Sequence, residues 1–212
     1  MNLSGNINTG LRRVPPWLIY VACGLYIGWQ FWMALSGAGR YRIEPINELE
    51  REYGETAILL LMVGLLVSPL RSWFGINLMK FRRAIGVSAF FLVLAHFMVW
   101  AVLDVRSFGR VWVEMVNRPY VTIGMVSFTL LIPLVITSNN SAVRRMGARA
   151  WKQLHKLTYP AAVFAALHYL WLVKGFQWKP VIYMAIIVGL IALRYGLQPI
   201  LRLDRTQQPG KP

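Results

Sequence analysis

The chain has 212 residues, 57% of them hydrophobic, and a formal net charge of +15. Because its apolar residues are gathered in long runs, this composition excludes a soluble domain and indicates a single polytopic membrane unit. The basic residues lie between the apolar runs, as the positive-inside rule expects, so the charge does not indicate nucleic-acid binding. The single cysteine, Cys23, excludes an intrachain disulfide and a thiolate-ligated cluster.

Six apolar runs, each near the roughly 20 residues that a membrane-spanning helix needs, predict an all-α integral membrane protein. We expect a short N-terminal tail over residues 1–15, a six-transmembrane-helix bundle over residues 16–197 and a polar tail over residues 198–212. The runs cover residues 16–35, 56–70, 85–103, 119–136, 157–173 and 180–197.

The connections between the runs differ in charge. The first (residues 40–55) holds five glutamates, the third (residues 104–118) is mixed with Trp112 as an interface anchor, and the fourth (residues 140–156) is strongly basic. Of the 23 lysines and arginines, 15 lie in the two tails, in the second and fourth connections and near the end of the sixth run (Arg194), while seven of the eight acidic residues lie on the other side. This bias predicts that both termini are cytoplasmic.

The chain has three histidines, and two of them lie deep in apolar runs. His96 and His168 are each about two-thirds of the way along a run, and the predicted topology makes these two runs parallel. The two imidazoles are therefore expected at a similar depth, where they could bind a haem iron from both faces. A membrane histidine can also serve only as a packing hydrogen bonder, which is the alternative.

His155 lies 13 residues before His168, roughly 20 Å deeper along a straight helix. It is a candidate ligand for a second haem, and Pro160 could kink the helix enough to turn both histidines to one side. No histidine occupies the matching position on the third run, where Arg82 and Arg83 are found instead. Arginine is a poor iron ligand but a good partner for carboxylates, so these two residues are expected to bind haem propionates, to anchor the inner membrane face, or both.

Motifs for nucleotide binding are missing from the sequence: it has no Gly-rich dinucleotide motif after a strand and no Walker motif. Electrons are therefore expected to come from a quinol or from a separate protein, and to leave to an acceptor that docks from outside. A small transporter or assembly scaffold with packing or proton-relay histidines is the alternative from a different class.

Together, several motifs resemble the MsrQ family (formerly YedZ) of the ferric reductase-like transmembrane superfamily. The resemblance spans about residues 53–195. Its motifs are GETAILLLMVGLLVSPL (54–70), FRRAIG (81–86) followed by His96, NRPYVTIG (117–124), ITS (136–138), WKQLHKLTY (151–159) and HYLW (168–171).

The resemblance implies a b-type cytochrome of the bacterial inner membrane that passes electrons from the quinone pool to MsrP, a periplasmic molybdopterin enzyme that repairs oxidised methionines. The substrate chemistry would then belong to the partner. It also implies FMN, for which the sequence offers no recognisable site, and one haem b or two. A haem-containing reductase of external metal ions is the alternative.

Overall fold

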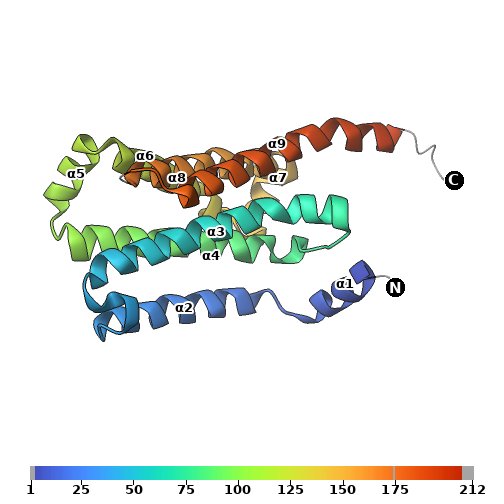
Figure 1. Cartoon of the computed structure of the whole chain (residues 1–212). Coiled ribbons are helices and arrows are strands. Elements are labelled where there is room, and N and C mark those ends of the chain that lie inside the picture. The colour runs from blue at the N-terminus through green and yellow to red at the C-terminus, as the bar shows by residue number, and fades with distance from the viewer. Residues whose placement is uncertain (1–2, 174, 207–212) are drawn as a thin grey trace.

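The computed structural model describes residues 3–173 and 175–206, and every regular element in these two segments is helical (Figure 1). The all-helical prediction is thus confirmed. The elements are α1 (Leu3–Arg13), α2 (Trp17–Leu35), η1 (Gly39–Arg42), α3 (Pro45–Phe74), η2 (Met79–Phe81), α4 (Arg82–Met98), η3 (Val99–Asp104), α5 (Phe108–Asn117), α6 (Pro119–Ile136), α7 (Asn140–Leu154), η4 (His155–Leu157), α8 (Thr158–Leu172) and α9 (Trp178–Thr206).

Among the described residues, five helical segments are long and apolar enough to cross a bilayer. They are Trp17–Arg42, Pro45–Phe74, Met79–Asp104, Pro119–Ile136 and Trp178–Tyr195. The run expected at residues 157–173 forms α8, which has 15 residues. At about 1.5 Å per residue α8 is shorter than the roughly 30 Å hydrocarbon layer, so the expected sixth span stays a prediction.

Helices extend into both expected tails and into the expected connections, including α5 in the third connection. The tail at residues 1–15 holds α1, and the acidic connection ends where α3 begins at Pro45. Proline suits a first helical position, and Glu48 lies in the first turn of α3, where the helix dipole favours negative charge. The basic fourth connection holds α7, whose backbone turns sharply at Gly147 (φ 77°, ψ 153°). α9 continues to Thr206, and residues 207–212 of the expected C-terminal tail lie outside the described residues.

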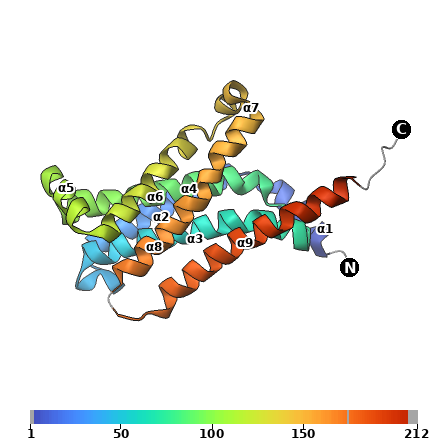
Figure 2. The same ribbon diagram turned by 90° about the horizontal axis from the view of Figure 1, so that it is seen from above.

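The bundle is organised around two helix pairs, α3 with α4 and α6 with α8, which come together where α4 packs against α6 (Figures 1 and 2). α9 covers α3 and α8, and α2 lies at the edge against α3 and α4. The α8 seam is built from small residues: Ala161, Ala162 and Ala166 are completely buried. Small residues let helix backbones approach closely in membranes, so α6, α8 and α9 can bring side chains to a common centre.

A π-helical turn, η3, follows α4 directly. Its wider winding appears in the bond from the Val105 N–H to the Trp100 carbonyl, five residues back, at 2.9 Å. Such turns occur mostly as single insertions in α-helices and often at functional sites. Here the turn begins three residues after His96 and buries Val99, Trp100 and Ala101.

Candidate functional site

His96 on α4 and His168 on α8 lie opposite each other at the centre of the bundle. Their ring centres are 6.2 Å apart, and the ring planes make an angle of 76°. An imidazole–metal bond is about 2 Å long, and with the ring radius added on each side, two imidazoles on one ion have centres about 6 Å apart. The observed separation therefore fits two axial ligands of a single metal ion.

The outer nitrogen of each ring contacts a backbone carbonyl on a neighbouring helix. His96 Nδ1 lies 2.8 Å from the Glu50 carbonyl oxygen, and His168 Nδ1 lies 2.7 Å from that of Tyr120. Because a carbonyl only accepts, Nδ1 must carry the proton in both rings. This fixes the tautomer that leaves each Nε2 lone pair free, as in metal sites where the second ring nitrogen donates to a carbonyl.

Both histidines pack over a glycine. A Cβ added to Gly54 would lie 3.1 Å from His96 Nδ1, and one added to Gly124 would lie 2.9 Å from His168 Nδ1. In each case the carbonyl that the histidine bonds belongs to the residue four positions before the glycine, on the same face of that helix. The missing side chain thus opens a path from the imidazole to the helix backbone, and the arrangement occurs twice, on α3 and on α6.

A cavity of about 900 Å³ surrounds the histidine pair. This is within the roughly 300–1,000 Å³ of small-molecule and cofactor sites. One wall is aromatic, formed by Trp100 and by Phe97 and Phe128, whose rings are stacked with centres 5.3 Å apart. Such a wall suits a flat apolar ligand with polar or charged substituents at one edge.

Cationic side chains line the same cavity. They are Arg51 on α3, Arg118 just before α6, and Lys179 on α9. Arg118 pairs with Glu114 and Lys179 with Glu55, whereas Arg51 has no acidic partner among the described residues. Guanidinium and ammonium groups at this rim could bind carboxylates of a ligand whose apolar part lies against the aromatic wall.

No group of three or more His, Cys, Asp or Glu side chains within the described segments could hold a metal ion. A structural or catalytic ion held by protein alone usually takes three or four such ligands. Two imidazoles in a large cavity with an aromatic wall therefore suit a metal that brings further ligands of its own, as iron does in haem.

His155 lies apart from this pair and does not line the cavity. Its half-buried ring stacks on Trp151, with centres 3.9 Å apart, and its Nε2 is 3.1 Å from the Thr137 hydroxyl oxygen. The charges of Arg82 and Arg83 lie near its ring. Thr137 thus engages Nε2 of His155, and no hydrogen bond to Nδ1 is found among the described residues.

Arg82 and Arg83 also lie outside the cavity of the histidine pair. Arg83 donates to the Asn140 side chain at 2.8 Å, while half-buried Arg82 lies beside Tyr159 and Arg194. Arg194 in turn lies 5.3 Å from the Tyr159 ring centre and donates to Ser68 at 2.9 Å. None of these three arginines is in an ion pair within the described part of the chain.

The structure brings together two of the five residues singled out in the sequence, His96 and His168. It places His155, Arg82 and Arg83 in a separate group beside α7 and the start of α4. The glycines opposite the rings were not singled out, although GETAILL begins with Gly54 and NRPYVTIG ends with Gly124. Arg51, Arg118 and Lys179 were assigned only to connections, because nothing in their spacing links them to a histidine.

The comparisons with known proteins agree with this architecture. A family model described as "Ferric reductase like transmembrane component" matches residues 53–166, from Tyr53 on α3 to Ala166 on α8. The chain therefore belongs to the ferric reductase-like transmembrane proteins.

Three relatives, from Brucella ovis, Brucella canis and Brucella suis, are each 40% identical to the chain over 195 residues, covering 92% of the chain and 86% of the relative. Each is a "Protein-methionine-sulfoxide reductase heme-binding subunit MsrQ". The chain is thus a member of the MsrQ family.

Proposed function

We propose that the chain is the haem-binding membrane subunit of a methionine sulfoxide reductase system, passing electrons from quinol to a periplasmic molybdopterin reductase of the MsrP type. The observation that carries the proposal is the His96–His168 pair, whose ring separation and tautomers suit a bis-imidazole metal site. The names of the Brucella relatives, which are haem-binding subunits, support the same reading.

The chain's own residues have distinct tasks in this proposal. His96 and His168 would hold the haem iron through Nε2, while the Glu50 and Tyr120 carbonyls hold Nδ1 and keep the rings from rotating. Bound haem b supplies a one-electron carrier. Phe97, Phe128 and Trp100 keep water away from it, and the cationic rim of the cavity would bind its propionates.

The proposed topology has six spans with both termini cytoplasmic, in the bacterial inner membrane. α8 is the sixth span: together with η4 and the extended residue that follows, it reaches close to the thickness of the hydrocarbon layer. Exposed tryptophans near both ends of the bundle support this placement, since tryptophan is enriched at membrane interfaces. Trp17 and Trp73 lie at the end of the bundle where α1 is found. Trp112, Trp171 and Trp178 lie at the opposite end, where α5 is found.

The proposal also includes a site for a second haem, near His155. His155 through Nδ1 could supply one ligand, and the nearby Arg82 and Arg83 could bind the propionates of that haem. FMN is expected from the family resemblance alone.

The test is the reduced-minus-oxidised absorption spectrum of the purified chain produced with adequate haem supply. A b-type spectrum is expected, nearly abolished in His96→Ala and His168→Ala. His155→Ala is the matched comparison: it should retain the haem of the central pair, and any fall in haem-to-protein ratio would report a second site. A colourless wild type, or histidine variants with unchanged spectra, would contradict the proposal and favour a transporter or scaffold.

The electron acceptor is tested separately. Haem reduced by a quinol should be reoxidised by an MsrP-type reductase and not by ferric chelates. Reoxidation by chelates alone would instead identify a metal reductase.

A further inference from the structure

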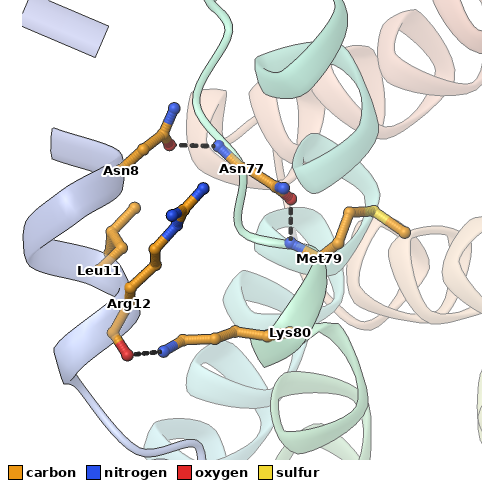
Figure 3. Close-up of a pocket in the computed structure, with 6 residues that line it drawn as sticks. All are labelled: Asn8, Leu11, Arg12, Asn77, Met79 and Lys80. Carbon is orange, nitrogen blue, oxygen red and sulfur yellow. Dashed lines mark hydrogen bonds between the residues drawn. The ribbon is translucent and has the colours of Figure 1, made fainter. Parts of the chain in front are cut away.

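A second hollow lies at the other end of the bundle, between α1 and the segment that joins α3 to η2 (Figure 3). Its volume is about 180 Å³, several times the roughly 30 Å³ that a water molecule occupies in the liquid. The lining residues are Asn8, Leu11 and Arg12 of α1, and Asn77, Met79 and Lys80 of the facing segment. None of them is acidic, and the histidine cavity shares none of them.

Hydrogen bonds and apolar contacts hold the two sides of the hollow together. Asn8 Nδ2 donates to the Gly75 carbonyl and Asn8 Oδ1 accepts from the Asn77 N–H, both at 2.8 Å. Leu11 packs with Leu78 against a buried cluster of Val67, Phe81 and Ile85. α1 is therefore docked on the bundle in a defined position.

The side-chain groups of this hollow that have no hydrogen-bond partner among the described residues are donors. Both asparagine oxygens are used inward: Asn8 Oδ1 accepts from Asn77 N, and Asn77 Oδ1 accepts from Met79 N at 3.2 Å. Both bonds fix the amide orientation, because a backbone N–H can only donate, and leave the Asn77 Nδ2 group free. Lys80 gives one of its three protons to the Arg12 carbonyl at 2.9 Å and keeps two.

The Arg12 guanidinium contributes most to this donor set. It extends toward the Asn8–Asn77 hydrogen bond (Figure 3) and has no hydrogen-bond or ion-pair partner within the described residues. A planar guanidinium beside an ammonium and an amide matches the oxygens of a phosphate. Two cations with free donors and no acceptor define a site for an anion.

We propose that this hollow binds the phosphate of an anionic phospholipid in the leaflet that faces the two termini. The hollow adjoins the start of α2 at Trp17, a span whose first residues would lie at the headgroup level. Basic pockets on the cytoplasmic side of membrane proteins bind anionic headgroups, and Leu11 and Met79 offer apolar surface beside the charges. A soluble phosphate would use the same donors, so the experiment must separate the two sources.

The experiment is native mass spectrometry of the purified full chain in mixed micelles containing equal amounts of phosphatidylglycerol and phosphatidylcholine. A retained phosphatidylglycerol adduct is expected, because the choline cation would lie against Arg12 and Lys80. Arg12→Gln should lower its affinity about tenfold, as expected for one charge-assisted contact. Arg13→Gln, one residue along the same helix and equally exposed, is the matched control and should have no effect.

A second variant covers the case in which Arg12→Gln disturbs α1. Asn77→Asp keeps the oxygen that accepts from Met79 N and replaces the free amide donor by a negative charge. It should abolish the adduct while leaving thermal unfolding of the chain unchanged.

Three outcomes would overturn the proposal. Equal losses in Arg12→Gln and Arg13→Gln would show general attraction by the basic surface. Unchanged binding in Asn77→Asp would place the lipid elsewhere. Displacement of the adduct by millimolar inorganic phosphate would identify a soluble anion as the ligand. Because lipid binding is measured on the chain with or without haem, the result is independent of the proposed electron transfer.

Discussion

At the scale of single residues, the two glycines opposite the histidines decide how the imidazoles are held. Alanine at Gly124 would bring a methyl group to 2.9 Å from His168 Nδ1, closer than at Gly54, where the distance to His96 Nδ1 is 3.1 Å. A shift of either ring breaks the Nδ1 bond to the carbonyl, and loss of such outer partners typically lowers metal affinity about 10–100-fold. We therefore expect Gly124→Ala to reduce haem occupancy strongly and Gly54→Ala to reduce it less.

The control for this prediction is Gly86→Ala on α4, where an added Cβ meets nothing within 4 Å. Alanine in an open helical position is favoured over glycine by about 1 kcal/mol, so this variant should keep its haem and unfold at the same or a slightly higher temperature. Haem-to-protein ratio and the intensity of the Soret band measure all three variants. Equal occupancy in Gly124→Ala and Gly86→Ala would show that the close contact does not position the ligand.

These residues also show which parts of the site can be predicted from the sequence and which cannot. The depth of His96 and His168 follows from counting along two runs, because helical rise converts residue number into distance. Their contacts with Gly54 and Gly124 do not follow, since they depend on which helices become neighbours and on the rotation of each about its axis. The separate position of His155 has the same cause: the turn at His155–Leu157 sets the direction of its ring before Pro160 is reached.

At the scale of helices, α8 depends on its buried alanines to hold His168 in place. Ala161 is completely buried against Leu61, Ala89 and Leu131, and its carbonyl accepts a 2.8 Å bond from the buried Ser127 hydroxyl of α6. Overpacking a filled core costs about 1–3 kcal/mol. Ala161→Leu should therefore lower the unfolding temperature in detergent and push α8 away from α6, with loss of haem.

Ala192→Leu, on the exposed side of α9, introduces the same side chain without a buried contact and should change neither quantity. Circular dichroism during heating and the haem spectrum measure both variants. Unaltered stability in Ala161→Leu would mean that the α6–α8 seam is loosely packed.

The sequence predicted the long apolar helices but missed the short polar ones. Long apolar runs identify α2, α3, α4, α6 and α9, because their composition alone requires a membrane. α1 and α7 were read as tail and loop since they are polar, although Ile7 and Leu11 recur with helical spacing and Asn139 caps α7 by accepting from Ala142 N. Packing on the bundle, rather than propensity, stabilises these short amphipathic elements.

At the scale of the whole molecule, the remaining question is whether α8 crosses the bilayer. Gly147, in the sharp turn within α7, and Gly175, between α8 and α9, lie before and after α8. If α8 is a span, these two positions face opposite sides of the membrane; if α8 is re-entrant, they face the same side. The positive-inside count predicts that Gly147 is cytoplasmic and Gly175 external.

Single cysteines at these glycines, in a Cys23→Ser background, give the measurement. A membrane-impermeant maleimide applied to intact spheroplasts should label Gly175→Cys and not Gly147→Cys, and lysis should expose the latter. Gly109→Cys in α5 serves as the external reference and Gly10→Cys in α1 as the internal one, because neither glycine would meet a buried neighbour.

Both glycines beside α8 have positive φ, 77° and 81°, so the substitutions strain the local turn, and the haem spectrum of each variant verifies that the bundle is intact. Labelling of Gly147→Cys and Gly175→Cys from the same side would reduce the spans to five. It would also place the two termini on opposite sides, and electrons from the His96–His168 site would then need a different route to an external acceptor.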